Sequence, residues 1–431
     1  MPVLIRGDDL RVLGNRSYLR VFLARTGSYL GTAIAPVALA FAVLDMPGGS
    51  ATRLGLVLLV RQLAQIVLLL LGGVIADRLP RNKVMVASDL LSAAGQAGIA
   101  ALFLVHTSNL LPILGLAVLT GAGPALFIPA STGLIPQVVG QAQLQSANSL
   151  LRFTMNSSTV FGAAIAGVLT ATIGPGWALA VDAFSYLFSA ALLAGIKLPR
   201  PEQLPATSKI ADLRAGWREF VSRQWLWIIV LQFSISNACY NGGINVLAPL
   251  VAHDRLGGVL AWAVFSVARA AGLVAGSLVA MRVRPRFPLR VATLATFGFV
   301  PAFFAWAFAA PVWLLAITAL MIGVSLDIFS VLWDTSLQRH VPQQALSRVS
   351  AYDALGSVAL GPLGLAVAGP AASVFGVTDT LIVSGLLCAG TSVAALASPA
   401  VRNLSAQPSP APGRVLAAPP GLPQAGEASG S

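Results

Sequence analysis

Charged side chains are scarce in this chain, and that scarcity decides its class. Only 10% of its 431 residues are charged, whereas 56% are hydrophobic, and the mean hydropathy is +0.81. A soluble domain carries about 25% charged residues, so the composition predicts an integral membrane protein. The length allows about twelve spans of roughly 20 residues with short loops between them. Long apolar runs of helical length exclude an outer-membrane barrel.

Cysteines and catalytic motifs are also scarce. The two cysteines, Cys239 and Cys388, lie inside apolar runs, so they provide no disulfide framework and no metal-ligand spacing. The histidines are scattered, and no Gly-x-x-x-x-Gly-Lys-Ser/Thr sequence occurs, which argues against ATP-driven transport by this chain. No nucleophile triad is apparent. We therefore expect no enzyme activity, no cofactor and no bound metal.

The formal net charge of +12 is spread over alternate loops. A nucleic-acid-binding protein would gather this charge in a patch with stacking aromatics, so we interpret it as membrane topology and expect no nucleic-acid partner. The asymmetry predicts a multi-pass protein of the bacterial cell membrane with both termini in the cytoplasm. One side holds most basic residues near span ends, among them Arg78, Arg81, Lys83, Arg200, Arg284 and Arg348, and the other essentially Arg53 and Arg255.

The apolar runs fall into two groups of six. The predicted spans are about 17–44, 54–76, 84–105, 110–134, 148–172, 176–196, 225–251, 259–281, 289–309, 312–337, 352–375 and 379–398. The resulting parts are a cytoplasmic lead-in (1–16), a first bundle (17–196), an amphipathic linker on the cytoplasmic membrane face (197–224), a second bundle (225–401) and a disordered tail (402–431).

The most specific motif lies in the basic turn between spans two and three. Glycines and a proline suit a tight turn, and cations keep it in the cytoplasm. Asp77 is the unusual residue, because an acid is not needed to orient the loop. It either interacts with a positive charge or with a helix N-terminus, or it merely caps the turn.

Five residues of this turn resemble the loop 2–3 signature of the major facilitator superfamily. They are Gly73, Asp77, Arg78, Arg81 and Lys83. The resemblance implies an all-α integral membrane fold of twelve transmembrane helices in two pseudo-symmetric six-helix bundles, with these residues acting as a conformational latch.

The second half repeats the turn in part. Gly276 and a basic cluster recur there, but Ala280 stands where the first half has Asp77, so the halves resemble diverged copies; two unrelated basic turns are the alternative. Further motifs, such as Phe127-Ile128-Pro129, are similar to those of a bacterial efflux branch that includes the enterobactin exporter and macrolide-efflux-like proteins.

Ionisable residues inside spans are candidates for function, because a charge at mid-membrane costs roughly 2.5–3.5 kcal/mol. No glutamate lies in a span, so a proton carrier there must be an aspartate. Asp327, Ser330 and Asp334 share one face of span ten. Arg269, in the middle of span eight, is expected to pair with Asp327 or Asp334, either for proton coupling or as a static ion pair.

Polar stripes on spans one and seven predict a wet cavity. Three amides facing lipid would be costly, although hydrogen bonding between helices is an alternative explanation, and Arg25 could instead extend to the membrane surface. In the resembled superfamily, spans one, four, seven and ten line the central cavity. The stripes are Arg25, Ser28 and Thr32 in span one, and Asn237, Tyr240, Asn241 and Asn245 in span seven.

These features predict a secondary transporter that exports amphipathic small molecules by proton antiport with alternating access. Its partners would be a small-molecule substrate, protons and the lipid bilayer, and we expect a monomer. Two departures from the superfamily's drug antiporters bear on coupling: span four has no arginine, and span five lacks their Gly-Pro motif. A nutrient importer or facilitator and a non-transporting scaffold or sensor are the alternatives.

Overall fold

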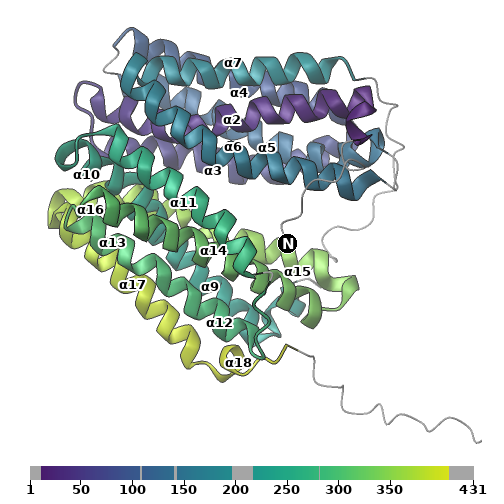
Figure 1. Cartoon of the computed structure of the whole chain (residues 1–431), viewed down its shortest axis with the longest axis vertical. Helices are drawn as coiled ribbons and strands as arrows, with labels where there is room; N and C mark the ends of the chain where they lie inside the picture. Colours follow the sequence, from purple (N-terminus) through teal and green to yellow (C-terminus); the bar gives the residue numbers. More distant parts are fainter. Residues whose placement is uncertain (1–10, 107–108, 140–142, 197–216, 281, 407–431) are drawn as a thin grey trace, which may run out of the picture.

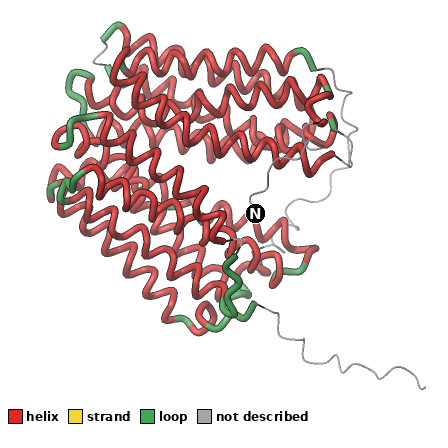
Figure 2. The backbone as a smooth tube through the Cα atoms, in the orientation of Figure 1, coloured by secondary structure: helices red, strands yellow, loops and turns green. Residues whose placement is uncertain are grey.

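The computed structural model describes residues 11–106, 109–139, 143–196, 217–280 and 282–406. Side chains at 70–78 and 343–348 fall outside the description. Every regular element in these ranges is helical, and short loops join the helices (Figure 2). The all-α prediction is confirmed for this part of the chain.

The first half is a bundle of six long helices that follow a short 3-10 turn, η1 (Arg11–Gly14). Asn15 caps the first of them, because its side chain accepts hydrogen bonds from the backbone N–H groups of Ser17 and Tyr18. Within the bundle α4 packs between α5 and α7, and α2 packs against α6 and α7. The helices are α2 (Arg16–Asp45), α3 (Ala51–Arg78), α4 (Arg81–Leu104), α5 (Leu110–Val138), α6 (Leu144–Ile173) and α7 (Pro175–Ala194).

The second half has the same plan with more interruptions. Glycine and proline cause several of them; for example, the predicted eleventh span starts earlier than expected and breaks at Leu360, before Gly361 and Pro362. The elements are α9 (Gln224–Cys239), η3 (Tyr240–Leu247), α10 (Ala248–Arg255), α11 (Val259–Ala280), α12 (Pro288–Ala295), η4 (Thr296–Phe299), α13 (Val300–Ala307), α14 (Val312–His340), α15 (Gln343–Ala359), α16 (Gly361–Phe375), α17 (Val377–Ala397) and α18 (Pro399–Arg402).

Eleven helical segments of the described residues are long and apolar enough to cross a membrane. The predicted seventh span is missing from that number, because the π-helical turns of η3 divide it into three short pieces. These pieces follow one another without a gap from Gln224 to Arg255, so the chain still runs as one helical stretch. The other eleven predicted spans each correspond to one of the eleven segments.

The two halves meet at one end and separate at the other (Figure 1). At the closed end α3 packs on α16 and α6 packs on α11. Glycine makes the first contact possible, because a Cβ on Gly55 would collide with the carbonyl oxygen of Leu365, and one on Gly369 would collide with the backbone of Thr52. Small residues allow such close backbone approach between membrane helices.

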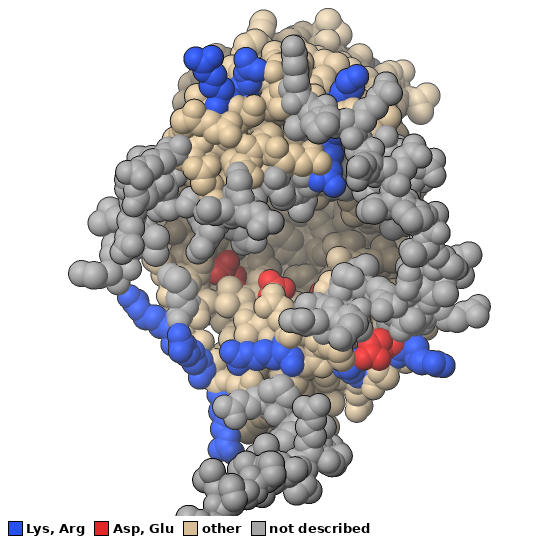
Figure 3. Space-filling view, turned by 90° about the vertical axis from the view of Figure 1, so that its right-hand side faces the viewer, with Lys and Arg blue, Asp and Glu red and all other residues tan. Residues whose placement is uncertain are grey.

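The opposite face is hollowed between the halves. Figure 3 shows this hollow with Lys and Arg side chains around its rim and acidic side chains inside it. Residues 1–10, 197–216 and 407–431 are outside the described residues, and with them most of the predicted linker and tail. Before that point the tail contacts the second half, because the N–H of Ala406 donates to the carbonyl of Arg286.

We predict that Gly55→Val forces the closed end apart. The added side chain must displace the α16 backbone, and overpacking of this kind costs roughly 1–3 kcal/mol, so a cysteine placed at the buried position Ala51 should react with a thiol reagent about tenfold faster. Gly390→Val in α17 is the matched control, because a Cβ there meets nothing within 4 Å. Equal labelling rates in both variants would show that this contact does not hold the end shut.

Candidate functional site

A cavity of about 500 Å³ lies between the halves and is formed by α2, α3, α9, η3, α11 and α16. It takes polar residues from both halves, and no acidic residue is among those that line it. The apolar part of the wall includes Pro36, Leu54, Leu58 and Leu365. The polar part is Arg61, Gln62, Gln65, Asn237, Tyr240, Asn241, Asn245, Trp262 and Arg269.

The amide face predicted on span seven lies on this cavity and forms a ladder. Asn245 Nδ2 donates to Asn241 Oδ1 at 3.0 Å, and Asn241 Nδ2 donates to Asn237 Oδ1 at 2.8 Å. Asn237 Nδ2 in turn donates to the carbonyl oxygen of Ser357 in α15 at 3.1 Å. The ladder begins where α9 becomes the π-helical η3, a type of turn often found at functional sites. The amides are therefore largely satisfied by one another.

Each half contributes one arginine to the cavity, Arg61 from α3 and Arg269 from α11. A glycine of the neighbouring helix lies close to the carbonyl oxygen of each, because a Cβ added to Gly121 of α5 would collide with that of Arg61, and one added to Gly323 of α14 with that of Arg269. The arrangement repeats in the two halves and holds both arginines on helices packed at backbone distance. Arg61 was not among the residues predicted from the sequence, although a lone arginine within an apolar span is itself a signal.

The predicted face of span one lies elsewhere. Thr32 contacts the interior of its own bundle, where its hydroxyl is 3.1 Å from the hydroxyl of Tyr186 in α7. The guanidinium of Arg25 lies over the ring of Tyr29, 5.2 Å from its centroid. Neither they nor Ser28 line the central cavity, to which α2 contributes Pro36 and Ala40 instead.

The predicted pair of Arg269 with Asp327 does not form. Asp327 packs against Gly276, two helical turns along α11 from Arg269, which is a rise of about 10 Å. Its Oδ2 is buried without a hydrogen-bond partner in the described part of the chain. The hypothesis was wrong about this pair because spacing within span ten does not determine its register against span eight.

Ser330 and Asp334 line a second, smaller hollow of about 300 Å³ between α9, α14 and α15. It contains another carboxylate, Asp353, which sequence analysis did not consider. Trp333 Nε1 donates to Asp353 Oδ2 at 3.0 Å, and Ser357 Oγ donates to its Oδ1 at 3.3 Å. Two carboxylates from different helices therefore share this hollow.

Two further aspartates, Asp89 and Asp182, are buried inside the first bundle. Their side chains are only 2% and 1% exposed, so both carboxylates lie within the packed helices. Neither oxygen of Asp182 has a hydrogen-bond partner among the described residues, and its carboxylate interacts electrostatically with Arg61. Arg61 thus lies between a buried acid and the cavity.

The predicted latch is only partly described. Gly73, Asp77 and Arg78 are in the last turns of α3, where side chains are outside the description. Arg81 begins α4 and Lys83 is exposed on its first turn. The role of these five residues stays a prediction.

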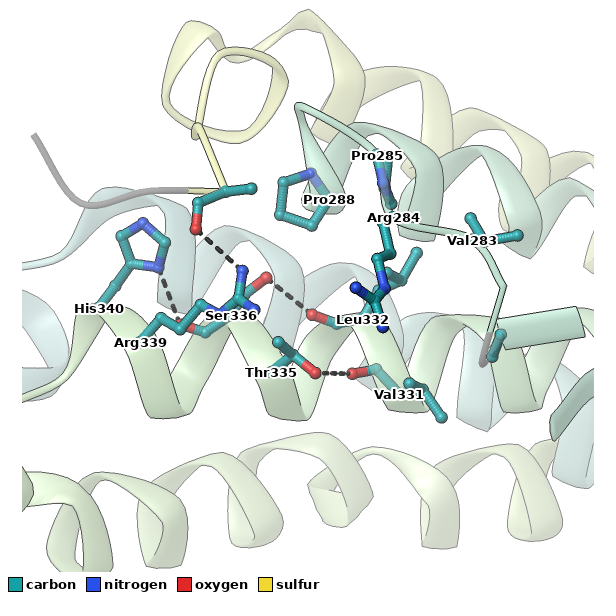
Figure 4. A pocket seen from close by; sticks show the side chains of 12 residues that line it. Val283, Arg284, Pro285, Pro288, Val331, Leu332, Thr335, Ser336, Arg339 and His340 are labelled. Atoms are coloured by element: carbon teal, nitrogen blue, oxygen red, sulfur yellow. Dashed lines mark hydrogen bonds between the residues drawn. The ribbon is translucent and has the colours of Figure 1, made fainter. Parts of the chain in front are cut away.

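A further hollow lies on the flank of the second half, between α12 and α14 (Figure 4). Its volume is about 430 Å³, and Arg284, Arg339 and His340 reach it. The hydroxyls of Thr335 and Ser336 donate to backbone carbonyls of their own helix, and Arg339 donates to the carbonyl of Ala406. This hollow takes no residue from the first half, unlike the central cavity.

The family profile described as the Major Facilitator Superfamily matches residues 21–361. The chain belongs to this superfamily. It is therefore a multi-pass membrane transporter for a small-molecule substrate and not an enzyme.

Relatives and solved structures agree with the assignment. The chain is 29% identical to the enterobactin exporter EntS of Citrobacter koseri over 86% of this chain and 90% of that protein. It is 27% identical to the transporter YkuC of Bacillus subtilis over 65% of this chain and 68% of that protein. Its fold is similar to that of the nucleoside transporter NupG, with a TM-score of 0.71 at 11% identity over 88% and 98% of the two chains. The fold is also similar to that of a bacterial homologue of the lysosomal transporter Spinster in an inward-facing conformation. The TM-score is 0.65 at 16% identity, over 94% of this chain and 100% of that chain.

At its closed end the transporter has a polar contact between the halves. His253 Nε2, at the end of α10, is 3.0 Å from Asp45 Oδ1 at the end of α2, and its Nδ1 is 2.6 Å from Asp254 Oδ1. The ring also packs on Phe41, 6.3 Å between centroids. The hydrogen bond to Asp254 raises the pKa of His253, partial burial opposes this, and the charge of Asp45 adds to the rise.

We predict that this contact weakens as the pH rises. Because the pKa of His253 is raised in the closed arrangement, its contribution is complete below about pH 6.5 and is lost as the pH passes through the raised value. The three groups are about one third to one half exposed, so the effect should change the closed population less than tenfold, about 0–1 kcal/mol.

Spin labels at Ser50 and Leu256, one on each half, would measure the separation between the halves as a function of pH. We expect wider distances at high pH in the wild type and no pH response in His253→Gln. His106→Gln, at an exposed histidine of the first half, is the control. A His253→Gln protein with the wild-type pH response would contradict this assignment.

Proposed function

We propose that this transporter is a secondary exporter of amphipathic small molecules of the drug, antibiotic or siderophore-like class, driven by proton antiport. The observation that supports it most is the match to an enterobactin exporter over most of both chains. The cavity between two halves closed at one end fits alternating access, in which the halves rock around a fixed central site.

We further propose that the open face is cytoplasmic. Basic residues gather around it (Figure 3), and basic loops stay inside the cell. In an exporter this conformation is the one that loads substrate from the cytoplasm or the inner leaflet. Opening at the other side would require the α3–α16 and α6–α11 contacts to separate while the basic ends come together.

Proton coupling has candidates on the open side of the second half. Asp334 and Asp353 share one hollow, and Asp327 has a buried oxygen without a hydrogen-bond partner in the described residues. A carboxylate that is exchanged between water and a low-dielectric environment changes its preference for a proton, so rocking of the halves would couple to protonation.

We predict that Asp334→Asn and Asp327→Asn each reduce proton-driven transport about fivefold or more, since coupling free energies are typically 1–3 kcal/mol. Everted membrane vesicles with an imposed pH gradient would be assayed with two dyes on the same xanthene ring, the anion fluorescein and the cation rhodamine 123. Asp379→Asn, at an exposed acid in the first turn of α17, is the control. Wild-type flux in both variants would place the carrier elsewhere, and no flux of either dye by the wild type would remove this proposal.

We predict that Asp77→Asn weakens transport without preventing membrane insertion. In the latch hypothesis its carboxylate stabilises the state in which the cytoplasmic ends meet, facing the segment from Ser350 to Tyr352, so its loss should slow the cycle while the bundle still folds. Transport rate per inserted molecule is the measurement. Asp77→Asn combined with Leu79→Asp, at an exposed position of the turn, tests whether an acid elsewhere in the turn can substitute. Unchanged efflux at normal expression would remove the latch.

A further inference from the structure

The electrostatic character of the central cavity is positive. Arg61 and Arg269 line it from opposite halves, and its lining contains no aspartate or glutamate. No hydrogen bond or ion pair of either guanidinium is formed within the described residues. A cation within a membrane span is expensive, and such residues normally pair with an opposite charge or face water.

Acidic residues inside the two bundles compensate this positive charge only in part. Asp182 interacts electrostatically with Arg61 from behind, inside the first bundle. On the other side Asp327 lies two turns along α11 from Arg269. At least one positive charge of the cavity is therefore left for a ligand.

The free hydrogen-bond donors of the cavity also favour a negatively charged ligand. Each asparagine of the ladder donates a hydrogen bond within the ladder or to Ser357, and Asn237 and Asn245 each use one of their two amide N–H groups in this way. The indole Nε1 of Trp262, in contrast, is buried and has no partner in the described part of the protein. The two guanidinium groups of the cavity can donate but cannot accept hydrogen bonds. Such a set is complementary to an oxyanion.

A mainly apolar recess adjoins Arg269. Arg269, Asn237 and Tyr240 belong both to the cavity and to a neighbouring hollow walled by Phe233, Phe299, Ile322 and Leu326. The Tyr240 and Phe299 rings are 6.4 Å apart between centroids. A flat or aromatic body could lie in this recess while a negative group reaches the arginines.

We propose that the cavity binds an amphipathic organic anion, with its carboxylate, phenolate or sulfonate between Arg61 and Arg269 and its apolar body in the Phe233–Phe299 recess. The inference rests on the proposed export function and specifies its substrate class. Charge-assisted bonds to guanidinium are strong and geometrically selective. Because the two arginines belong to different halves, the anion would contact both halves at once and connect them across the cavity.

The two arginines should contribute unequally to anion binding. When the site is empty, Arg61 still interacts electrostatically with Asp182, whereas Arg269 has no acidic neighbour of this kind among the described residues. Arg269 should therefore lose more binding energy on substitution than Arg61. Export of an anion from a cell that is negative inside is also favoured by the membrane potential.

The test is equilibrium binding of fluorescein and rhodamine 123 to the purified full-length chain, measured by fluorescence anisotropy, beside efflux of both dyes. The variants are Arg61→Gln, Arg269→Gln and Arg269→Lys. Arg290→Gln removes an exposed arginine at the start of α12 and is the matched control. Each variant is checked for expression and a single size-exclusion peak.

We expect the wild type to bind fluorescein more tightly than rhodamine 123. Arg269→Gln should weaken fluorescein binding about tenfold or more, Arg61→Gln should weaken it less, and Arg269→Lys should restore much of the loss, since a charged hydrogen bond is worth about 1.5–3 kcal/mol, or roughly tenfold to 150-fold in affinity. Rhodamine 123 binding should be unchanged or improved in the glutamine variants.

Absence of fluorescein binding, or fluorescein binding that is unaffected by both glutamine substitutions, would overturn the anion site. If rhodamine 123 is still exported in that case, the proposed exporter stands without it. The opposite result, arginine-dependent fluorescein binding with no efflux of either dye, would support the anion site and remove the export function.

Discussion

The structure depends on the close approach of two pairs of helix backbones at one end of the molecule. At Gly55 and Gly369 the absence of a Cβ lets α3 and α16 touch, and Gly167 lets α6 approach Ala263 of α11 in the same way. In chain order these are spans two with eleven and five with eight, which are equivalent positions in the two repeats. Contact at one end makes the halves diverge toward the other, and the central cavity lies where they begin to separate.

Polar groups within the membrane are handled in three ways. The asparagines of α9 and η3 donate hydrogen bonds to one another along a single helix face that lines the cavity. Asp182 is enclosed in the first bundle with an arginine nearby. Arg269 lines the cavity itself, and no acidic residue is among the described residues that line it. The cost of an unpaired charge in a low-dielectric medium makes the third group the one most tied to function.

The site and the closed end belong to one mechanical unit. α2 contributes Pro36 and Ala40 to the cavity and Asp45 to the contact with His253, while α11 contributes Arg269 to the cavity and Ala263 to the α6 contact. A ligand that draws the two halves together at the cavity therefore acts on the same helices that hold the end shut. Membrane-facing surface around this unit is rich in exposed large hydrophobic side chains, as a lipid environment requires.

The sequence alone determined the class, the two groups of six spans and the amide face of span seven, because apolar length and helical period are local properties of the chain. It did not predict the π-helical interruption at Tyr240, where Gly242 and Gly243 lie tightly against α16, Phe303 and Leu381. Nor could it predict which charges meet. Arg269 lies beside Asn237 and away from Asp327, Arg61 shares its cavity, and His253 meets Asp45 across 208 positions of sequence. These relations depend on the register between helices far apart in the chain, and only tertiary packing decides that register.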